Sequence, residues 1–213
     1  MLVKICGFTR AQDIAAAGAA GADAIGLVFD EGPHCVDIEQ GRQLLEACRR
    51  LPHRVECIAV TGQLTIERVA PLRALGFDGI QAGVCPWQPE LGDDHTYLLP
   101  AFFDSEDLVQ RVAAHRAAHL LKWDLDGRSL RGMVNIDSAA GGGTGQPADW
   151  QRAALVCAAG PTALAGGLRA DNVADAIAVT GAAAVDVCSG VERSPGVKDA
   201  ALMRAFVDAA RGH

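Results

Sequence analysis

The stretch PTALAGGLRADNVADAIAVTGAAAVDVCSGVERSPG (161–196) contains two strand-like apolar runs, and small residues follow each of them. The first run, Pro161 to Ala165, ends at Gly166-Gly167. The second, Ala183 to Cys188, ends at Ser189-Gly190. A single Gly-Gly pair is usually only a tight turn. Two such turns, each between a strand and a helix start, instead favour close approach of the backbone to an anion. They predict a two-part phosphate site at the open end of a parallel sheet.

Apolar runs alternate with Ala-rich amphipathic stretches along the whole chain, which is typical of βα units around a parallel sheet. The runs predict strands at 2–5, 24–29, 55–60, 79–82, 97–103, 134–136, 161–165 and 183–188. The segments between them predict helices at 10–20, 37–50, 64–75, 105–116 and 149–158, a helix beginning at 169–172, and a closing helix at 199–210. Eight units without a linker predict one (β/α)8 barrel domain over residues 1–213, whose last two loops commonly bind phosphate. A doubly wound sheet fits less well, because the chain lacks a strong switch point.

Two segments interrupt this alternation. Residues 83–96 carry two prolines and two glycines, so we expect a loop there. Residues 119–133 contain Asp126-Gly127 between short apolar runs, which predicts a small β-hairpin insertion.

Composition narrows the class of protein. The net charge of −7 argues against a nucleic-acid partner, which usually requires a basic surface. The seven cysteines are scattered without a CxxC pair, which argues against a disulfide framework and a structural zinc site. No apolar run approaches the roughly 18 residues of a membrane span. We expect a cytoplasmic protein with reduced thiols and no membrane partner, either a monomer or a homodimer.

Two residues at predicted strand ends could carry proton-transfer chemistry. Cys6 follows the first apolar run and Asp137 ends the sixth, so in a barrel both face the end that carries the phosphate turns. Burial should raise the pKa of Asp137 so that it holds a proton, and an electropositive strand end should lower that of Cys6. Such a pair suits general acid–base catalysis. Cys188 also ends a strand, but we expect it to serve packing.

Several longer segments resemble the phosphoribosylanthranilate isomerase family of tryptophan biosynthesis. The matching segments are KICGFTRAQD (4–13), GADAIGLVF (21–29), IDSAAGGGTG (136–145), LAGGLRADNVADAI (164–177) and VDVCSGVERSPGVKD (185–199). Together they cover both ends of the chain and are specific in combination.

The resemblance implies an Amadori rearrangement of N-(5-phosphoribosyl)anthranilate to 1-(2-carboxyphenylamino)-1-deoxyribulose 5-phosphate, without a cofactor or a metal. By this resemblance Asp137 is the acid that opens the sugar ring, and Cys6 is the base that removes the C2 proton. Asp126 is the rival acid if the hairpin is absent. The implied phosphate ligands are Gly143, Thr144, Gly145, Gly166, Gly167, Ser189 and Gly190.

The middle of the chain departs from the family pattern. Where the family carries Ser-Pro-Arg, whose Arg pairs with the anthranilate carboxylate, this chain has Gly32-Pro33-His34. His is a weaker carboxylate partner than Arg. The family's Gln-Leu-His-Gly becomes Gln81-Ala82-Gly83-Val84, and its strand-five Lys becomes Pro100. His34 and Gln81 are therefore the candidate ligands of the aglycone. Two alternatives stay open: an isomerase of a different phosphoribosylamine, and a non-catalytic barrel that binds phosphate ligands.

Overall fold

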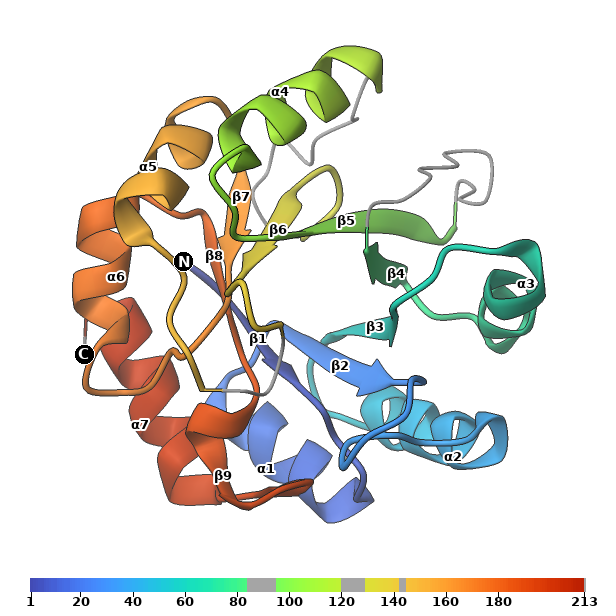
Figure 1. Ribbon diagram of the computed structural model, residues 1–213. Helices are drawn as coiled ribbons and strands as arrows, with labels where there is room; N and C mark the ends of the chain where they lie inside the picture. The colour runs from blue at the N-terminus through green and yellow to red at the C-terminus, as the bar shows by residue number, and fades with distance from the viewer. Residues whose placement is uncertain (84–94, 120–128, 142–144, 213) are drawn as a thin grey trace.

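The computed structural model describes residues 1–83, 95–119, 129–141 and 145–212. In this part of the chain eight parallel strands close into a barrel in chain order, with β8 paired to β1 (Figure 1). The strands are β1 (Leu2–Cys6), β2 (Ala24–Val28), β3 (Glu56–Thr61), β4 (Gly79–Gly83), β5 (Tyr97–Phe103), β6 (Val134–Asp137), β7 (Thr162–Leu164) and β8 (Ala184–Val187). The predicted (β/α)8 barrel is confirmed.

Helices form an outer ring around these strands (Figure 1). They are α1 (Ala11–Ala20), α2 (Ile38–Arg49), α3 (Ile66–Leu75), α4 (Leu108–Ala118), α5 (Trp150–Ala158), α6 (Val173–Thr180) and α7 (Ala200–Arg211). Three begin where an Asp side chain accepts hydrogen bonds from the first turn: Asp37 before α2, Asp149 before α5 and Asp199 before α7. All three caps lie where the sequence predicted the helices to begin.

The barrel is packed on both faces of its sheet, and this explains why the strands read as nearly continuous apolar runs. One buried cluster lies between the strands and the helix ring and includes Ile5, Ile25 and Phe206. A second, smaller cluster includes Ile58, Leu99 and Met133. Three buried charged residues stand in these strands, Lys4 on β1, Glu56 on β3 and Asp186 on β8.

Some predicted elements differ from the structure. The helix expected from 105 begins three residues later, at Leu108, because Ser105 and Asp107 form a turn in which the Ser105 hydroxyl donates to the Asp107 carboxylate. After β8 the chain forms a short 3-10 helix, Ser189–Val191, and an antiparallel pair that the sequence did not predict, β9 (Glu192–Ser194) and β10 (Val197–Lys198). Gly196, at φ +76°, makes the turn between them.

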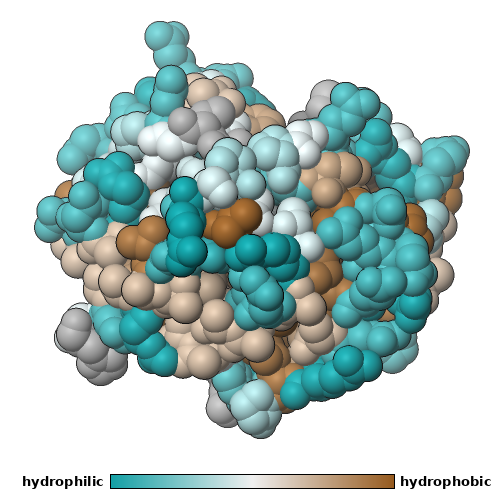
Figure 2. Space-filling model, turned by 90° about the horizontal axis from the view of Figure 1, so that it is seen from below, coloured by the Kyte–Doolittle hydropathy of each residue, from teal (hydrophilic) through white to brown (hydrophobic). Residues whose placement is uncertain are grey.

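The predicted loop at 83–96 and hairpin at 119–133 lie largely outside the described residues, as does the rival acid Asp126. Residues 129–133 form turns leading into β6. Among the described residues, no helix is both long and apolar enough to cross a membrane. Figure 2, which views the molecule from the side of α1 and α7, shows polar side chains spread over this face among weakly apolar ones.

Candidate active site

A cavity of about 310 Å³ opens where the carboxyl ends of the barrel strands meet. Its lining includes the last residue of most strands: Cys6, Val28, Thr61, Gly83, Phe103, Asp137 and Val187. This is the end at which barrel enzymes carry their active sites. Because the same end also carries both glycine turns predicted to bind phosphate, the cavity is the candidate active site.

The phosphate turns lie together on one side of this cavity. Gly145, Gly166-Gly167 and Ser189-Gly190 all line it, although they come from the loops after three different strands. Gly143 and Thr144 lie outside the described residues. The Asn172 side chain braces one turn, since its amide donates to Gly167 O and its oxygen accepts from Arg169 N.

Close backbone approach, and not only turn geometry, requires glycine in these turns. A Cβ on Gly190 would lie 2.0 Å from Leu168 O, and one on Gly167 would lie 2.7 Å from Pro147 N. Gly167 also has φ +61°, which side chains rarely adopt. The loops after β6, β7 and β8 therefore interlock through their backbones. Glycine turns of this kind let backbone N–H groups approach an anion.

Asp137, at the end of β6, is largely removed from solvent. Burial raises its pKa to about 6, and the nearby Asp186 carboxylate acts in the same direction. The Ser138 N–H, which donates to Asp137 Oδ1 at 2.7 Å, and the Lys4 ammonium oppose the rise. The direction agrees with the sequence prediction, and a carboxyl group of this kind can hold a proton near neutral pH.

Cys6, at the end of β1, is 8% exposed and lines the same cavity. The sequence predicted a lowered pKa for its thiol, and this was wrong in direction. Burial raises the pKa of Cys6, and the positive charges of Lys4 and Lys198 lower it by less than burial raises it. Proximity to an electropositive turn is therefore outweighed by the loss of water around the sulfur.

The sequence analysis missed a buried ion pair, Lys4 and Asp186, next to Cys6 and Asp137. Lys4 Nζ lies 2.6 Å from Asp186 Oδ2, and its positive charge opposes the rise in the pKa of Cys6. Asp186 Oδ1 has no hydrogen-bond partner among the described residues, and Asp186 lines the cavity. The signal was present, because a Lys and an Asp each interrupt an apolar strand, at Val3-Lys4-Ile5 and Val185-Asp186-Val187.

The two predicted aglycone ligands both line the cavity but differ in their surroundings. The Gln81 side chain is buried, and its Oε1 atom has no hydrogen-bond partner among the described residues. His34 Nε2 already lies 2.9 Å from Glu192 Oε1 and 3.6 Å from Cys188 Sγ. Cys188, expected to serve packing, instead lies on the cavity wall.

The cavity also has an apolar wall, which sequence reasoning did not identify. Val60, Ala82 and Ala101 line it, and Phe103 lies at its rim with 46% of its surface exposed. Pro100 does not line the cavity, since residues of β5 alternate between its two faces and Ala101 and Phe103 face inward. A flat apolar wall beside an exposed ring suits an aromatic group.

The described residues that line the cavity include no Lys or Arg side chain. At its rim Asp30 accepts hydrogen bonds from Gly62 N and from Arg68 Nη1, the latter at 2.7 Å. The cavity thus offers backbone N–H groups to a phosphate, an acid and a thiol to the middle of a ligand, and an apolar wall to a ring. It can bind an anionic ligand and move protons on it.

Comparison with known proteins agrees with this geometry. A family model described as N-(5'phosphoribosyl)anthranilate (PRA) isomerase matches residues 104–209. The N-(5'-phosphoribosyl)anthranilate isomerase of Pseudomonas paraeruginosa strain PA7 is 39% identical over 98% of this chain and 94% of its own length. That of Acidithiobacillus ferrooxidans is 38% identical over 99% of this chain and 97% of its own length.

Solved structures give the same result. Phosphoribosyl anthranilate isomerase from Thermotoga maritima superposes with a TM-score of 0.80, 26% identity and full coverage of both chains. A phosphoribosyl anthranilate isomerase in complex with reduced 1-(o-carboxyphenylamino)-1-deoxyribulose 5-phosphate has a TM-score of 0.78 and 26% identity, again with full coverage of both chains.

Proposed function

Since the chain belongs to the N-(5'-phosphoribosyl)anthranilate isomerase family, we propose that Cys6 and Asp137 carry out the isomerisation that the family name describes. The substrate is N-(5'-phosphoribosyl)anthranilate, and the product is 1-(2-carboxyphenylamino)-1-deoxyribulose 5-phosphate. The reaction is a step of tryptophan biosynthesis. The observation that carries the residue assignment is that Cys6 and Asp137 line one cavity together with both glycine turns.

Asp137 acts first, as a general acid. Its protonated carboxyl group donates to the ring oxygen of the furanose, the C1–O bond breaks, and the anilino nitrogen supplies the electron pair that forms an iminium ion. The raised pKa of Asp137 supports this role, because a carboxyl group with a pKa of about 6 is protonated in a useful fraction of molecules at neutral pH.

Cys6 acts second, as a general base. Its thiolate removes the proton from C2, the electrons of that C–H bond form the C1–C2 double bond of an enolamine, and the iminium nitrogen is neutralised. The enolamine then takes a proton at C1 and loses one from its C2 hydroxyl, which gives the ketone. Only protons leave or join the substrate, so this scheme requires no redox cofactor.

Lys4 and Asp186 influence the protonation of Cys6 and Asp137 through their charges. The Lys4 ammonium stabilises the Cys6 thiolate against the cost of burial, and Asp186 holds the ammonium in place. The Asp186 carboxylate also favours the protonated form of Asp137. One ion pair therefore supports a thiolate on β1 and a carboxylic acid on β6.

The phosphate is held by the turns at Gly145, Gly166-Gly167 and Ser189-Gly190, and the aromatic ring by the apolar wall that ends at Phe103. Gln81 and His34 face the aglycone end, and the Gln81 amide oxygen, which has no partner in the described part of the chain, is offered to the anilino N–H. A cytoplasmic location and a monomeric or dimeric state remain predictions from the sequence.

A steady-state assay on freshly prepared N-(5'-phosphoribosyl)anthranilate, following loss of its fluorescence, tests this proposal. We expect kcat/KM of about 10⁴ M⁻¹s⁻¹ or more. Background turnover by folded protein would contradict it and would favour a different phosphoribosylamine, and phosphoribosylamines that lack the aromatic carboxylate would be the next substrates to compare.

Substitution of the two reactive residues tests their roles separately from binding. Cys6→Ser and Asp137→Asn should each lower kcat by at least about 100-fold and leave the Kd of a phosphate-bearing product analogue within a few-fold of wild type. Cys157→Ser, which changes a cysteine of α5 outside the cavity lining, is the matched control for Cys6. Turnover near the wild-type rate in either active-site variant would remove that residue from the mechanism.

A further inference from the structure

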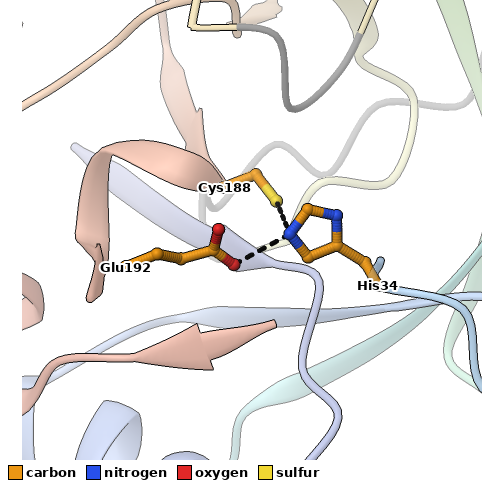
Figure 3. A group of neighbouring side chains, drawn as sticks. All are labelled: His34, Cys188 and Glu192. Atoms are coloured by element: carbon orange, nitrogen blue, oxygen red, sulfur yellow. Dashed lines mark hydrogen bonds and ion pairs between the residues drawn. The ribbon is translucent and has the colours of Figure 1, made fainter. Parts of the chain in front are cut away.

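Three side chains with metal-ligating atoms converge at the edge of the cavity (Figure 3). His34 comes from the loop after β2, Cys188 directly follows β8, and Glu192 begins β9. Their ligating atoms all lie within 4.8 Å of one another, and no other group of three His, Cys, Asp or Glu residues in the described ranges meets this condition. The proposed isomerisation uses neither Cys188 nor Glu192.

One distance within this cluster matches an edge of a zinc tetrahedron, and a second is a few tenths of an ångström shorter than its edge. Zinc binds thiolate sulfur at about 2.3 Å and imidazole nitrogen or carboxylate oxygen at about 2.0–2.2 Å, so sulfur and nitrogen ligands lie about 3.6 Å apart and nitrogen and oxygen ligands about 3.3 Å apart. Cys188 Sγ is 3.6 Å from His34 Nε2, and His34 Nε2 is 2.9 Å from Glu192 Oε1. An opening of a few tenths of an ångström between the imidazole and the carboxylate would admit the ion.

The surroundings hold two of the three ligands in place. Lys198 Nζ donates to Glu192 Oε1 at 2.8 Å and to the carbonyl oxygen of Cys188 at 3.0 Å. Burial opposes ionisation of Glu192, but hydrogen bonds from His34 and Lys198 keep its pKa below the usual range, so it is a carboxylate at neutral pH. The same oxygen, Oε1, faces His34 Nε2, so the ion and Lys198 would share it.

The thiol of Cys188 must lose its proton for an ion to bind. Burial raises the pKa of Cys188 to about 12, so without an ion it is a neutral thiol beside the imidazole. A coordinating metal ion removes the proton from a thiol outright, and zinc, the partner of thiolate and imidazole together, does so readily. Magnesium and calcium, which prefer oxygen ligands, do not suit this set.

We propose that His34, Cys188 and Glu192 form a site for a divalent cation of the zinc type at the edge of the cavity. His34 and Cys188 line the cavity, so a water molecule or an anionic group of a ligand can complete the tetrahedron from that side. The ion joins the loop after β2, which carries His34, to the end of β8 and the hairpin of β9 and β10. His34 and Cys188 are 154 residues apart in the chain. This proposal departs from the sequence analysis, which argued against a structural zinc site from the scattered cysteines and expected no metal, because the cluster joins residues that are far apart in the chain.

Cobalt substitution in the full-length protein, stripped of metal with a chelator, tests the proposal. Co²⁺ should bind with one equivalent and give a near-ultraviolet thiolate-to-cobalt absorption band, which Zn²⁺ then abolishes by displacing it. Cys188→Ser should lose the band, and His34→Gln should weaken Co²⁺ binding at least about tenfold. Cys35→Ser, which changes an exposed cysteine next to His34, should bind Co²⁺ as wild type does.

Thermal unfolding provides a readout that does not depend on absorption. Zn²⁺ should raise the Tm of wild type and of Cys35→Ser, because it binds the folded chain, and should not raise that of Cys188→Ser. Cys188→Ser and His34→Gln both leave the Glu192–Lys198 ion pair intact, so we expect both variants to fold.

Two results would overturn the proposal. One is the absence of a thiolate–cobalt band in wild-type protein, which would leave the cluster as a hydrogen-bonded group only. The other is a band that survives in Cys188→Ser, which would place the ion on another thiol such as Cys48 or Cys57. Neither readout requires turnover, so failure here is distinct from failure of the proposed isomerase activity.

Discussion

At the scale of single residues, the cavity raises the pKa of both groups that exchange protons with the substrate. Asp137 reaches about 6, while burial moves Cys6 above its ordinary value, so the acid has the lower pKa of the two. The reaction needs Asp137 protonated and Cys6 as a thiolate. When the pair holds one proton, most molecules carry it on Cys6, so the reactive arrangement is the less populated one. Few molecules hold this arrangement at any moment, but a thiolate with a high pKa is a strong base once it forms.

This order of pKa values predicts an unusual pH profile for kcat/KM. Below pH 6 both groups are protonated, and above the pKa of Cys6 both are deprotonated, so activity should rise up to about pH 6 and then stay level toward alkaline pH. Measurement of kcat/KM from pH 5 to 9 checks this. A rate that falls as pH rises through 6 would show instead that Cys6 is already a thiolate there.

The raised pKa of Asp137 also has a cost in stability. Its pKa is about 6 when folded and about 3.9 when unfolded, so the folded state favours the proton and loses stability as pH rises from 4 to 6. Asp137→Asn removes this loss and should raise the free energy of unfolding at pH 7 by up to about 3 kcal/mol. The gain should vanish below pH 4.

Urea unfolding of wild type and Asp137→Asn at pH 4 and pH 7 measures this difference. The Asn side chain can still accept from Ser138 N, so the local hydrogen bond is matched. An Asn variant that is less stable than wild type at pH 7 would mean that the carboxylate is stabilised by its surroundings and not penalised.

At the scale of elements, the loops after β6, β7 and β8 form one interlocked unit because glycines let their backbones touch. A position requires glycine either because its φ is positive or because there is no space for a Cβ, and Gly167 and Gly181 allow these two reasons to be tested separately. They have nearly the same φ, +61° and +66°, but a Cβ on Gly167 would clash with the backbone of residues 145–147, while a Cβ on Gly181 would meet nothing within 4 Å.

Alanine at each position should therefore have different effects. Gly181→Ala should cost about 1 kcal/mol, the penalty for a side chain in the left-handed region, and leave ligand affinity unchanged. Gly167→Ala should also displace the turn and raise the Kd of a phosphate-bearing product analogue at least about tenfold. Calorimetric titration and thermal unfolding of both variants measure the two effects, and equal affinity in both would place the phosphate elsewhere.

At the scale of the whole molecule, the first and last strands of the barrel are joined by a buried charge pair. Lys4 on β1 and Asp186 on β8 are 1% and 6% exposed and 2.6 Å apart. The pair lies where β1 and β8 close the sheet, in register with each other, so it stabilises closure as well as the reactive centre.

Removal of one partner of this ion pair should lower the free energy of unfolding strongly, and removal of both should lower it little. Lys4→Met leaves the Asp186 carboxylate buried and alone, and should lower the free energy of unfolding by about 3–5 kcal/mol. Lys4→Met combined with Asp186→Leu should recover most of this loss, though not the activity, because Cys6 loses its neighbouring ammonium. Urea unfolding of the single and double variants checks the prediction, and a double variant as unstable as Lys4→Met would contradict it.

The sequence by itself determined the order of strands and helices, because each apolar run and each helix cap is a local pattern. Asp37 and Asp199 begin their helices as predicted, and β5 has the bounds that its apolar run predicted. The barrel and the position of Cys6 and Asp137 at the cavity followed from these patterns, since strand ends in such a barrel meet at one face. The family was indicated by the resemblance of five longer segments. The β9–β10 pair was missed because its strands of three and two residues are too short to carry a periodic signal.

Only the tertiary structure decided how the site residues act on one another. The pKa of Cys6 depends on how much water surrounds its sulfur, and the Lys4–Asp186 pair and the His34–Cys188–Glu192 cluster each join residues more than 150 positions apart. Burial and electrostatic interactions depend on distance in space. A sequence names the charged groups, but closure of the barrel between β1 and β8 brings them together.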